Sequence, residues 1–157
     1  MVDHAEALQN VYAFKDFPKA ELQKLAAIAE HRYYGPKTVL CNEGEGQNDL
    51  YVILMGTVRV LKYGTEGEEE ITTLGSGATV GEIAFVLEEL DRSATLETKE
   101  PTSVLVFAHT ALDKLLATDP GLAARVYRGL ARSLANRLRS TTAAAANLKA
   151  QHIHHHH

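Results

Sequence analysis

Between residues 33 and 107, short runs of β-branched and aromatic residues alternate with turn-forming segments that contain glycine. Each run is three to five residues long: Thr38–Leu40, Leu50–Leu54, Thr57–Leu61, Ile71–Leu74, Ala94–Leu96 and Ser103–Phe107. Only Met55–Gly56 separates the second run from the third, a spacing typical of a hairpin. Many short strands at regular intervals predict a sandwich, a barrel or a jelly roll, and the pattern does not choose among the three.

Helical patterns flank this region. Before it, the sequence predicts a helix that starts near Pro18, where Phe17 and Leu22 can form a hydrophobic staple. Its apolar residues follow the i, i+3, i+4, i+7 spacing of one buried face: Leu22, Leu25, Ala26 and Ala29. After the strands, Thr110 and Asp113 resemble a capping box, with aspartate in place of the usual glutamate.

The last third of the chain predicts one long helix. Asp119 is a favourable N-cap, Pro120 suits the first helical position, and only Gly129 weakens the pattern up to about Lys149. About thirty residues at 1.5 Å each span roughly 45 Å, which is longer than a small β-domain needs. Part of this helix is therefore expected to pack on another body, most simply on a second copy of the chain.

The faces of this helix differ in character. At 100° per residue, one side is an apolar stripe: Leu122, Val126, Tyr127, Leu130, Leu134 and Leu138. The opposite side carries arginines that predict a solvated face: Arg125, Arg128, Arg132 and Arg139. Arg137 falls inside the apolar stripe, where an unpaired charge is costly. Three explanations stay open for it: the side chain extends to water, pairs with an acid of the domain, or meets an anionic ligand.

Charge is divided unevenly along the chain. Residues 1–119 hold 10 Lys+Arg against 20 Asp+Glu, whereas residues 120–151 hold six cations and no acid, within a net charge of −4. The division indicates either a basic segment that seeks an acidic partner or a basic helix lying on its own acidic domain. The histidine-rich end, residues 152–157, reads as a purification tag, so we expect a single domain over residues 1–151.

Several classes of protein are disfavoured. No apolar run is long enough to span a membrane, and a lone cysteine, Cys41, favours the reducing cytoplasm. A metalloenzyme of the cupin kind needs clustered ligands, but the histidines outside the tag are isolated: His4, His31 and His109. No Ser-His-Asp or Cys-His spacing is recognisable. The sequence therefore predicts a binding module that is not an enzyme and holds no metal.

The stretch from Thr79 to Thr95 carries the chemistry. Gly81 and Glu82 open a short apolar helical turn, and Arg92 and Ser93 follow ten residues later. Amides of a helical first turn and a guanidinium both suit phosphate oxygens, and a carboxylate can accept a hydrogen bond from a neighbouring sugar hydroxyl. Phosphate and sugar together indicate a nucleotide. The alternative is a Glu82–Arg92 salt bridge that closes a surface loop.

This stretch resembles the phosphate-binding cassette of the cyclic nucleotide-binding domain family, which includes catabolite activator proteins and protein kinase regulatory subunits. The resemblance covers about residues 8 to 140 and includes the Leu50–Val60 pattern, Leu74-x-x-Gly77 and Asp119–Pro120. It implies an α+β, mainly β fold. An antiparallel jelly-roll β-barrel over about residues 33–107 is flanked by an N-terminal helix and a long C-terminal lid and dimer helix over about 120–149.

By position, the resemblance assigns the anion and sugar contacts. Glu82 accepts from the ribose 2′-hydroxyl, Arg92 pairs with an exocyclic phosphate oxygen, and Gly81 lets the backbone come close. Main-chain amides and one hydroxyl complete the cradle: Ile83, Ala84 and Ser93. Val60 and Ile71 line the wall near the base, with Thr72 adjacent.

In this family the last helix acts as a lid over the base, and the resemblance implies that Arg137 and Thr141 fall where the lid contacts arise. The Arg92-Ser93-Ala94 order matches the activator branch that binds cAMP, with cGMP possible. Two residues depart from the usual cassette: Asp91 stands where proline is frequent, and Val80 where an aromatic residue is frequent.

The resulting hypothesis is a cytoplasmic regulatory module that senses a cyclic nucleotide and relays the signal through its C-terminal helix. Its expected partners are a second copy of the chain and an effector protein of unknown identity, without membrane or nucleic acid. Two alternatives stay open: a ligand-free dimerising scaffold of the same fold, and a truncated regulator that has lost its DNA-binding domain.

Overall fold

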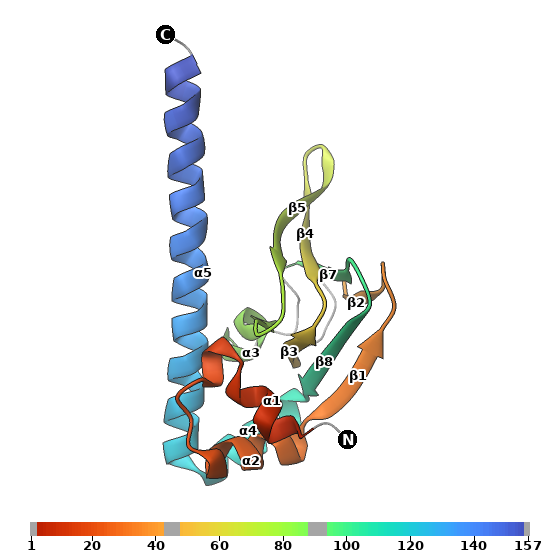
Figure 1. Cartoon of the computed structure of the whole chain (residues 1–157), viewed down its shortest axis with the longest axis vertical. Helices are drawn as coiled ribbons and strands as arrows, with labels where there is room; N and C mark the ends of the chain where they lie inside the picture. The colour runs from red at the N-terminus through yellow and green to blue at the C-terminus, as the bar shows by residue number, and fades with distance from the viewer. Residues whose placement is uncertain (1–2, 43–47, 88–93, 156–157) are drawn as a thin grey trace.

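The β-strands form two four-stranded antiparallel sheets in the computed structural model, which describes residues 3–42, 48–87 and 94–155, with side chains up to Ser140 and at Thr142 (Figure 1). The strand orders are β1-β8-β3-β6 and β2-β7-β4-β5. The strand bounds are β1 Glu30–Tyr34, β2 Val39–Cys41, β3 Leu50–Met55, β4 Val58–Gly64, β5 Gly67–Leu74, β6 Thr79–Val80, β7 Thr95–Thr98 and β8 Thr102–Phe107. This arrangement confirms the predicted jelly roll, which begins slightly before residue 33.

The helices gather at one end of the roll and along its side. Their bounds are α1 His4–Gln9, the 3₁₀-helix η1 Tyr12–Phe14, α2 Lys19–Ile28, α3 Glu82–Leu87, α4 His109–Thr118 and α5 Pro120–His155. The N-terminal helix and the long C-terminal helix are both present as predicted. In Figure 1, α5 continues well past α1, α2 and α4, and it extends beyond Lys149 into the histidine-rich end. No helix among the described residues is long and apolar enough to cross a bilayer.

The predicted hairpin at Met55–Gly56 is wrong. The strand β3 pairs with β6 and β8, whereas β4 pairs with β5 and β7, so the chain changes sheets between them. Gly56 has a φ of 100°, and a Cβ there would lie 2.6 Å from the carbonyl oxygen of Pro101 and 2.7 Å from the Cα of Thr102. The glycine serves a crossing between two sheets, which the local spacing cannot distinguish from a hairpin turn.

Two apolar cores lie on the two faces of the sheet that contains β3 and β8. Alternate residues of a strand point to opposite faces, so Tyr51 and Ile53 join one core while Leu50 and Val52 join the other. The core between the sheets contains Cys41, Tyr51, Ile53, Val58, Val80, Leu96, Val104 and Val106. The second core lies under the helices and takes in Leu22, Leu25, Phe107, Leu122, Val126 and Leu130. The buried positions of the face predicted from Leu22 are confirmed at Leu22 and Leu25. The stripe predicted from Leu122 is buried at Leu122, Val126 and Leu130 but exposed at Tyr127 and Leu138.

The predicted N-cap of α5 is correct, and the predicted capping box of α4 is wrong. Asp119 caps α5, because its Oδ1 accepts from the amide of Leu122 at 3.1 Å, and Lys24 donates to its Oδ2 at 2.7 Å, which lowers the pKa of this carboxyl. The capping box at Thr110 is wrong: the N-cap of α4 is Ala108, and Thr110 lies inside the helix. A remote acid replaces it, since Asp49 accepts from the amide of His109 at 3.0 Å.

The basic side of α5 lies against acids of the N-terminal segment. Arg125 pairs with Glu21 of α2, and Arg132 donates to Asp16 at 3.3 Å. In each pair one side chain is more than half exposed, Arg125 in the first and Asp16 in the second, so each contributes under about 1 kcal/mol. Of the two interpretations of the divided charge, these contacts favour the helix that lies on its own acidic domain.

A histidine pair predicts how stability depends on pH. The His31 ring lies edge-on to His4, with centroids 5.4 Å apart, and burial followed by this neighbour lowers the pKa of His31 from its usual 6.5. Because the unfolded chain takes up a proton that folded His31 resists, stability is full above pH 6.5 and is lost as pH falls toward the lowered pKa. Urea unfolding at about pH 7.5 and about pH 5 measures the loss.

The variant His31→Gln is expected to lose less stability than the wild-type protein over this interval. The matched variant His4→Gln removes only the smaller cause and should retain most of the pH dependence. Equal slopes in the wild-type protein and His31→Gln would contradict the assignment.

Candidate functional site

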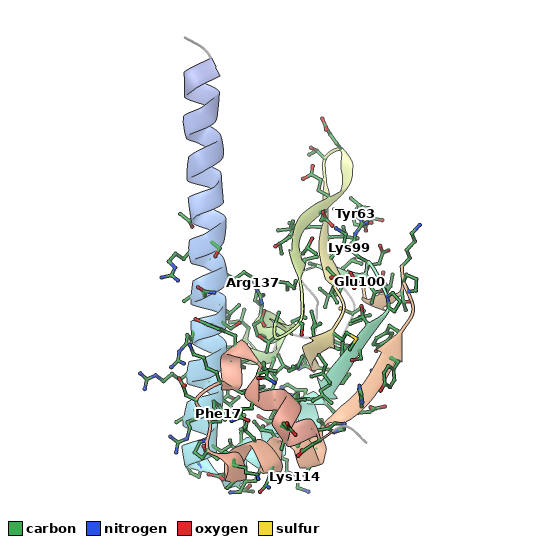
Figure 2. The ribbon with its side chains drawn as sticks, in the orientation of Figure 1. Phe17, Tyr63, Lys99, Glu100, Lys114 and Arg137 are labelled. Carbon is green, nitrogen blue, oxygen red and sulfur yellow. The ribbon has the colours of Figure 1, made fainter. Side chains whose placement is uncertain are left out.

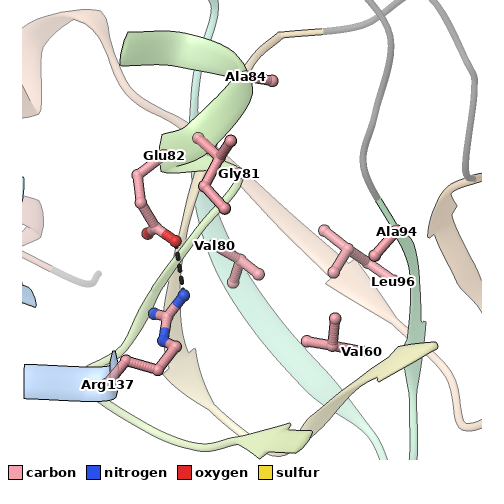
Figure 3. Close-up of a pocket in the computed structure, with 9 residues that line it drawn as sticks. Val60, Val80, Gly81, Glu82, Ala84, Ala94, Leu96 and Arg137 are labelled. Atoms are coloured by element: carbon pink, nitrogen blue, oxygen red, sulfur yellow. Dashed lines mark hydrogen bonds and ion pairs between the residues drawn. The ribbon is translucent and has the colours of Figure 1, made fainter. Parts of the chain in front are cut away.

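A pocket opens between the roll, α3 and α5. Nine residues line it: Val60, Val80, Gly81, Glu82, Ile83, Ala84, Ala94, Leu96 and Arg137 (Figure 3). They come from β4, β6, the first turn of α3, β7 with the residue before it, and α5. One wall is therefore apolar, and the facing wall carries one carboxylate and one guanidinium.

Glu82 is the buried acid of this pocket. Glu82 is only 2% exposed, although it is the first residue of α3. The buried strand β6 leads directly into the helix, so the first helical residue stays buried. Gly81 makes this junction with a φ of 89°, a backbone conformation that residues with a Cβ rarely adopt. The glycine therefore turns the chain so that the following carboxylate points inward.

Arg137 is the partner of Glu82. Its Nη1 donates to Glu82 Oε1 at 2.6 Å and its Nη2 to the carbonyl oxygen of Thr79 at 2.7 Å. Figure 2 shows Arg137 projecting from α5 toward the roll, and Figure 3 shows the ion pair along one side of the pocket, facing Val60 and Leu96. Of the three explanations for Arg137, the structure shows the pairing with an acid of the domain.

One polar atom of the pocket is unsatisfied. Glu82 Oε2 is buried and accepts no hydrogen bond within the described part of the chain. A buried carboxylate oxygen normally has a donor, so this atom marks a place where a ligand donor can bind. The pocket therefore combines a buried acceptor oxygen with an apolar wall.

Aromatic side chains join α3, the helix that begins at Glu82, to the C-terminal helices α4 and α5. Phe85 of α3 stacks with Tyr127 of α5 at a centroid distance of 6.2 Å and meets His109 of α4 edge-on at 5.4 Å. Phe85 is itself buried. A displacement of α3 would therefore move a side chain that contacts α5 directly.

The structure brings most of the predicted site residues together. Val60, the residues from Gly81 to Ala84, Ala94 and Arg137 all line the pocket. Ile71 does not: it is 56% exposed and sits at the irregularity in the β4–β5 pairing, outside the pocket. Thr72 lines a neighbouring groove between β5 and α5. Arg92 and Ser93 lie outside the described residues, as does the side chain of Thr141.

Two lining residues, Val80 and Leu96, were not predicted as contacts. Each belongs to the core between the sheets and also forms part of the pocket wall. Leu96 pairs with Val60 across β7 and β4, so the position facing a predicted wall residue could have identified it. Among the described residues, no group of three or more His, Cys, Asp or Glu side chains is arranged to hold a metal ion.

Comparison with known proteins extends these observations. The sequence profile described as "Cyclic nucleotide-binding domain" matches residues 31–119. The cAMP-activated global transcriptional regulator CRP of Haemophilus influenzae is 32% identical over 110 residues, which cover 69% of this chain and 49% of that protein. The potassium channel KAT3 of Arabidopsis thaliana is 26% identical over 119 residues, covering 76% of this chain and 18% of the channel. The chain thus spans about half the length of the first of these relatives and under a fifth of the second.

Solved structures show the same fold. A cyclic nucleotide-binding domain from Methylobacillus flagellatus superposes with a TM-score of 0.78 at 29% sequence identity, covering 88% of this chain and 78% of that one. The matched residues 31–119 make up more than half of the sequence, run from β1 to α4, and include every lining residue of the pocket except Arg137. The chain belongs to the cyclic nucleotide-binding domain family, whose members are regulatory binding domains.

Proposed function

We propose that this chain is a regulatory module that binds cAMP in the pocket at Glu82 and relays binding through α5. The observation that carries the proposal is the buried Glu82 carboxylate, whose Oε2 accepts no hydrogen bond among the described residues. A ribose 2′-hydroxyl supplies the missing donor. The choice of cAMP over cGMP is supported by the Arg92-Ser93-Ala94 order and by the cAMP-activated relative.

The phosphate is proposed to bind where the cassette begins. The first-turn amides of Ile83 and Ala84 have no carbonyl partner within the helix, so they are suited to phosphate oxygens. Arg92 and Ser93 are proposed to close the cradle from the following segment. Gly81 admits the phosphate because it adds no side chain at the junction of β6 and α3. Ala94, Val60 and Leu96 supply the apolar wall.

The relay is proposed to run through α5. The cassette helix touches this helix at Phe85 and Tyr127, and Glu82 holds Arg137, so a ligand that shifts α3 also shifts α5. Arg137 and Thr141 are the proposed lid contacts. The apolar stripe ends in an exposed Leu138, 68% accessible, which favours a second copy of the chain as the partner of α5. Sedimentation with and without cAMP measures this association.

The domain bounds, the cellular location and the effector contact are proposals as well. A single domain over residues 1–151 with a terminal tag accords with the packing of α5 on η1, α3 and α4. A cytoplasmic location is supported by the one cysteine, Cys41, which is buried. The effector protein is proposed to contact α5, where the relay ends.

Binding of cyclic nucleotides tests the proposal directly. Titration calorimetry of the purified chain is expected to show cAMP bound more tightly than cGMP. Replacing Arg92 by alanine is expected to cost about 1.5–3 kcal/mol, or about 10- to 100-fold in affinity, because a charge-assisted contact to phosphate is lost.

Arg128→Ala is the matched control, since Arg128 is exposed on the opposite face of α5 and its removal should leave the affinity unchanged. Unchanged cAMP affinity in Arg92→Ala would refute the cassette assignment. A folded wild-type chain that binds neither nucleotide would instead support the ligand-free scaffold.

A further inference from the structure

Three residues of α5, each four positions from the next, form one row that packs against η1 and β6: Gly129, Ser133 and Arg137. Gly129 meets η1 so closely that a Cβ there would overlap the carbonyl oxygen of Ala13. The Ser133 hydroxyl lies 3.3 Å from the hydroxyl of Thr79, and both residues are buried. Arg137 reaches the carbonyl of Thr79 and the carboxylate of Glu82. The row therefore determines where α5 sits relative to the pocket.

The chain segments that pack against these three residues are η1 and the stretch that runs from Gly77 through β6 to Glu82. Tyr12 of η1 donates its amide to the carbonyl of Gly77 at 3.1 Å, and Gly77 in turn donates to Ile53 at 2.8 Å. Thr79 follows in β6, and Glu82 follows β6 after Gly81. Helix α5 thus meets η1 at Gly129 and meets β6 through the Ser133 and Arg137 side chains, while η1 is hydrogen-bonded to Gly77, just before β6.

The two oxygens of Glu82 have different environments. Arg137 holds Oε1, whereas Oε2 is buried without a hydrogen-bond partner in the described residues. The Arg137 side chain is itself only 25% exposed and has a second anchor at Thr79. A guanidinium fixed at two points restrains the carboxylate that it holds, while Oε2 stays available as an acceptor.

We propose that Arg137 is a positioning residue for Glu82, and that the seating of α5 at Gly129 and Ser133 sets how strongly the pocket selects a ligand with a ribose 2′-hydroxyl. This inference rests on the proposed cyclic-nucleotide function. Arg137 acts through Glu82: when α5 is displaced, the carboxylate loses its orientation and the hydroxyl loses its acceptor, while the phosphate contacts remain.

The experiment compares the affinities of cAMP and 2′-deoxy-cAMP in the full chain. The wild-type protein is expected to prefer cAMP by about 10- to 100-fold, as for a hydrogen bond to a charged group. Arg137→Met should bring this ratio close to one by weakening cAMP more than the deoxy analogue. Arg137→Lys, which keeps a cation, should restore part of the ratio. A merely structural role would weaken both ligands by the same factor.

Variants remote from the pocket test the seating of α5. Gly129→Ala and Ser133→Ala are both expected to lower the ratio, and Ser133→Ala keeps the test valid should Gly129→Ala fail to fold. Gly121→Ala is the matched control, because it makes the same change in the same helix with ordinary space around the added methyl, and its ratio should equal that of the wild-type protein.

The possible outcomes separate failure of this inference from failure of the proposed function. A ratio unchanged in Arg137→Met and Ser133→Ala overturns the inference, and so does a wild-type protein that binds both ligands equally. In the first case the proposed function is unaffected. In the second, cAMP binding remains, but the assignment of Glu82 Oε2 to the ribose 2′-hydroxyl fails. Only a wild-type chain that binds neither ligand removes the proposed function and the inference together.

Discussion

Gly56→Ala is expected to lower the free energy of unfolding by about 3–4 kcal/mol, since a strained backbone and a steric overlap add together. The φ of 100° at Gly56 disfavours any residue with a Cβ. An added methyl would also meet backbone atoms of Pro101 and Thr102 at 2.6 and 2.7 Å, and neither atom belongs to a flexible side chain. Urea unfolding followed by circular dichroism measures the loss.

Gly67→Ala separates the two causes. Gly67 has a φ of 108°, close to that of Gly56, but nothing lies within 4 Å of an added Cβ. It should therefore show only the backbone cost, about 1–2 kcal/mol. Equal losses in the two variants would mean that the crossing between the sheets tolerates a side chain, against the packing described at Gly56.

Glu82→Ala is expected to lower the free energy of unfolding by about 3 kcal/mol and to abolish the preference for a 2′-hydroxyl. The stability falls because the largely buried guanidinium of Arg137 loses its carboxylate, and breaking a buried ion pair from one side costs about 3–5 kcal/mol. The lower end applies because Arg137 keeps its bond to Thr79. Urea unfolding and nucleotide titration measure the two effects separately.

Glu21→Ala provides a matched comparison. Glu21 also pairs with an arginine of α5, Arg125, but that arginine is more than half exposed, so its loss should cost under about 1 kcal/mol. The double variant Glu82→Ala, Arg137→Ala should recover part of the stability, because it leaves no unpaired charge. Similar losses in the two single variants would show that burial adds nothing to the Glu82 pair.

Much of the fold could be predicted from local patterns. Asp119 and Pro120 start α5 as predicted, because capping depends on residues adjacent to the helix end. The buried positions Leu122, Val126 and Leu130 follow from helical periodicity. Most of the candidate pocket was predicted through the cassette pattern around Gly81 and Glu82, where the backbone turn and the acid are neighbours in the chain.

The failures share a different cause. Met55–Gly56 has the spacing of a hairpin, but pairing with β8 and β6 takes β3 into the other sheet. Thr110 has the spacing of a cap, but Asp49, sixty residues away, supplies the acceptor at the start of α4. Ile71 was expected at the wall of the pocket, but the irregular β4–β5 pairing leaves it exposed.

Local sequence was thus sufficient for most element types and for the buried positions of α2 and α5, because backbone preference and periodicity act over a few neighbouring residues. Contacts between residues far apart in the chain determine three other features. These are the partner of Glu82, the acceptor for the His109 amide at the start of α4, and the assignment of each strand to a sheet. Arg137 shows the difference: periodicity placed it on the apolar side of α5, and only the packing of α5 on η1 and β6 brought it to the buried carboxylate.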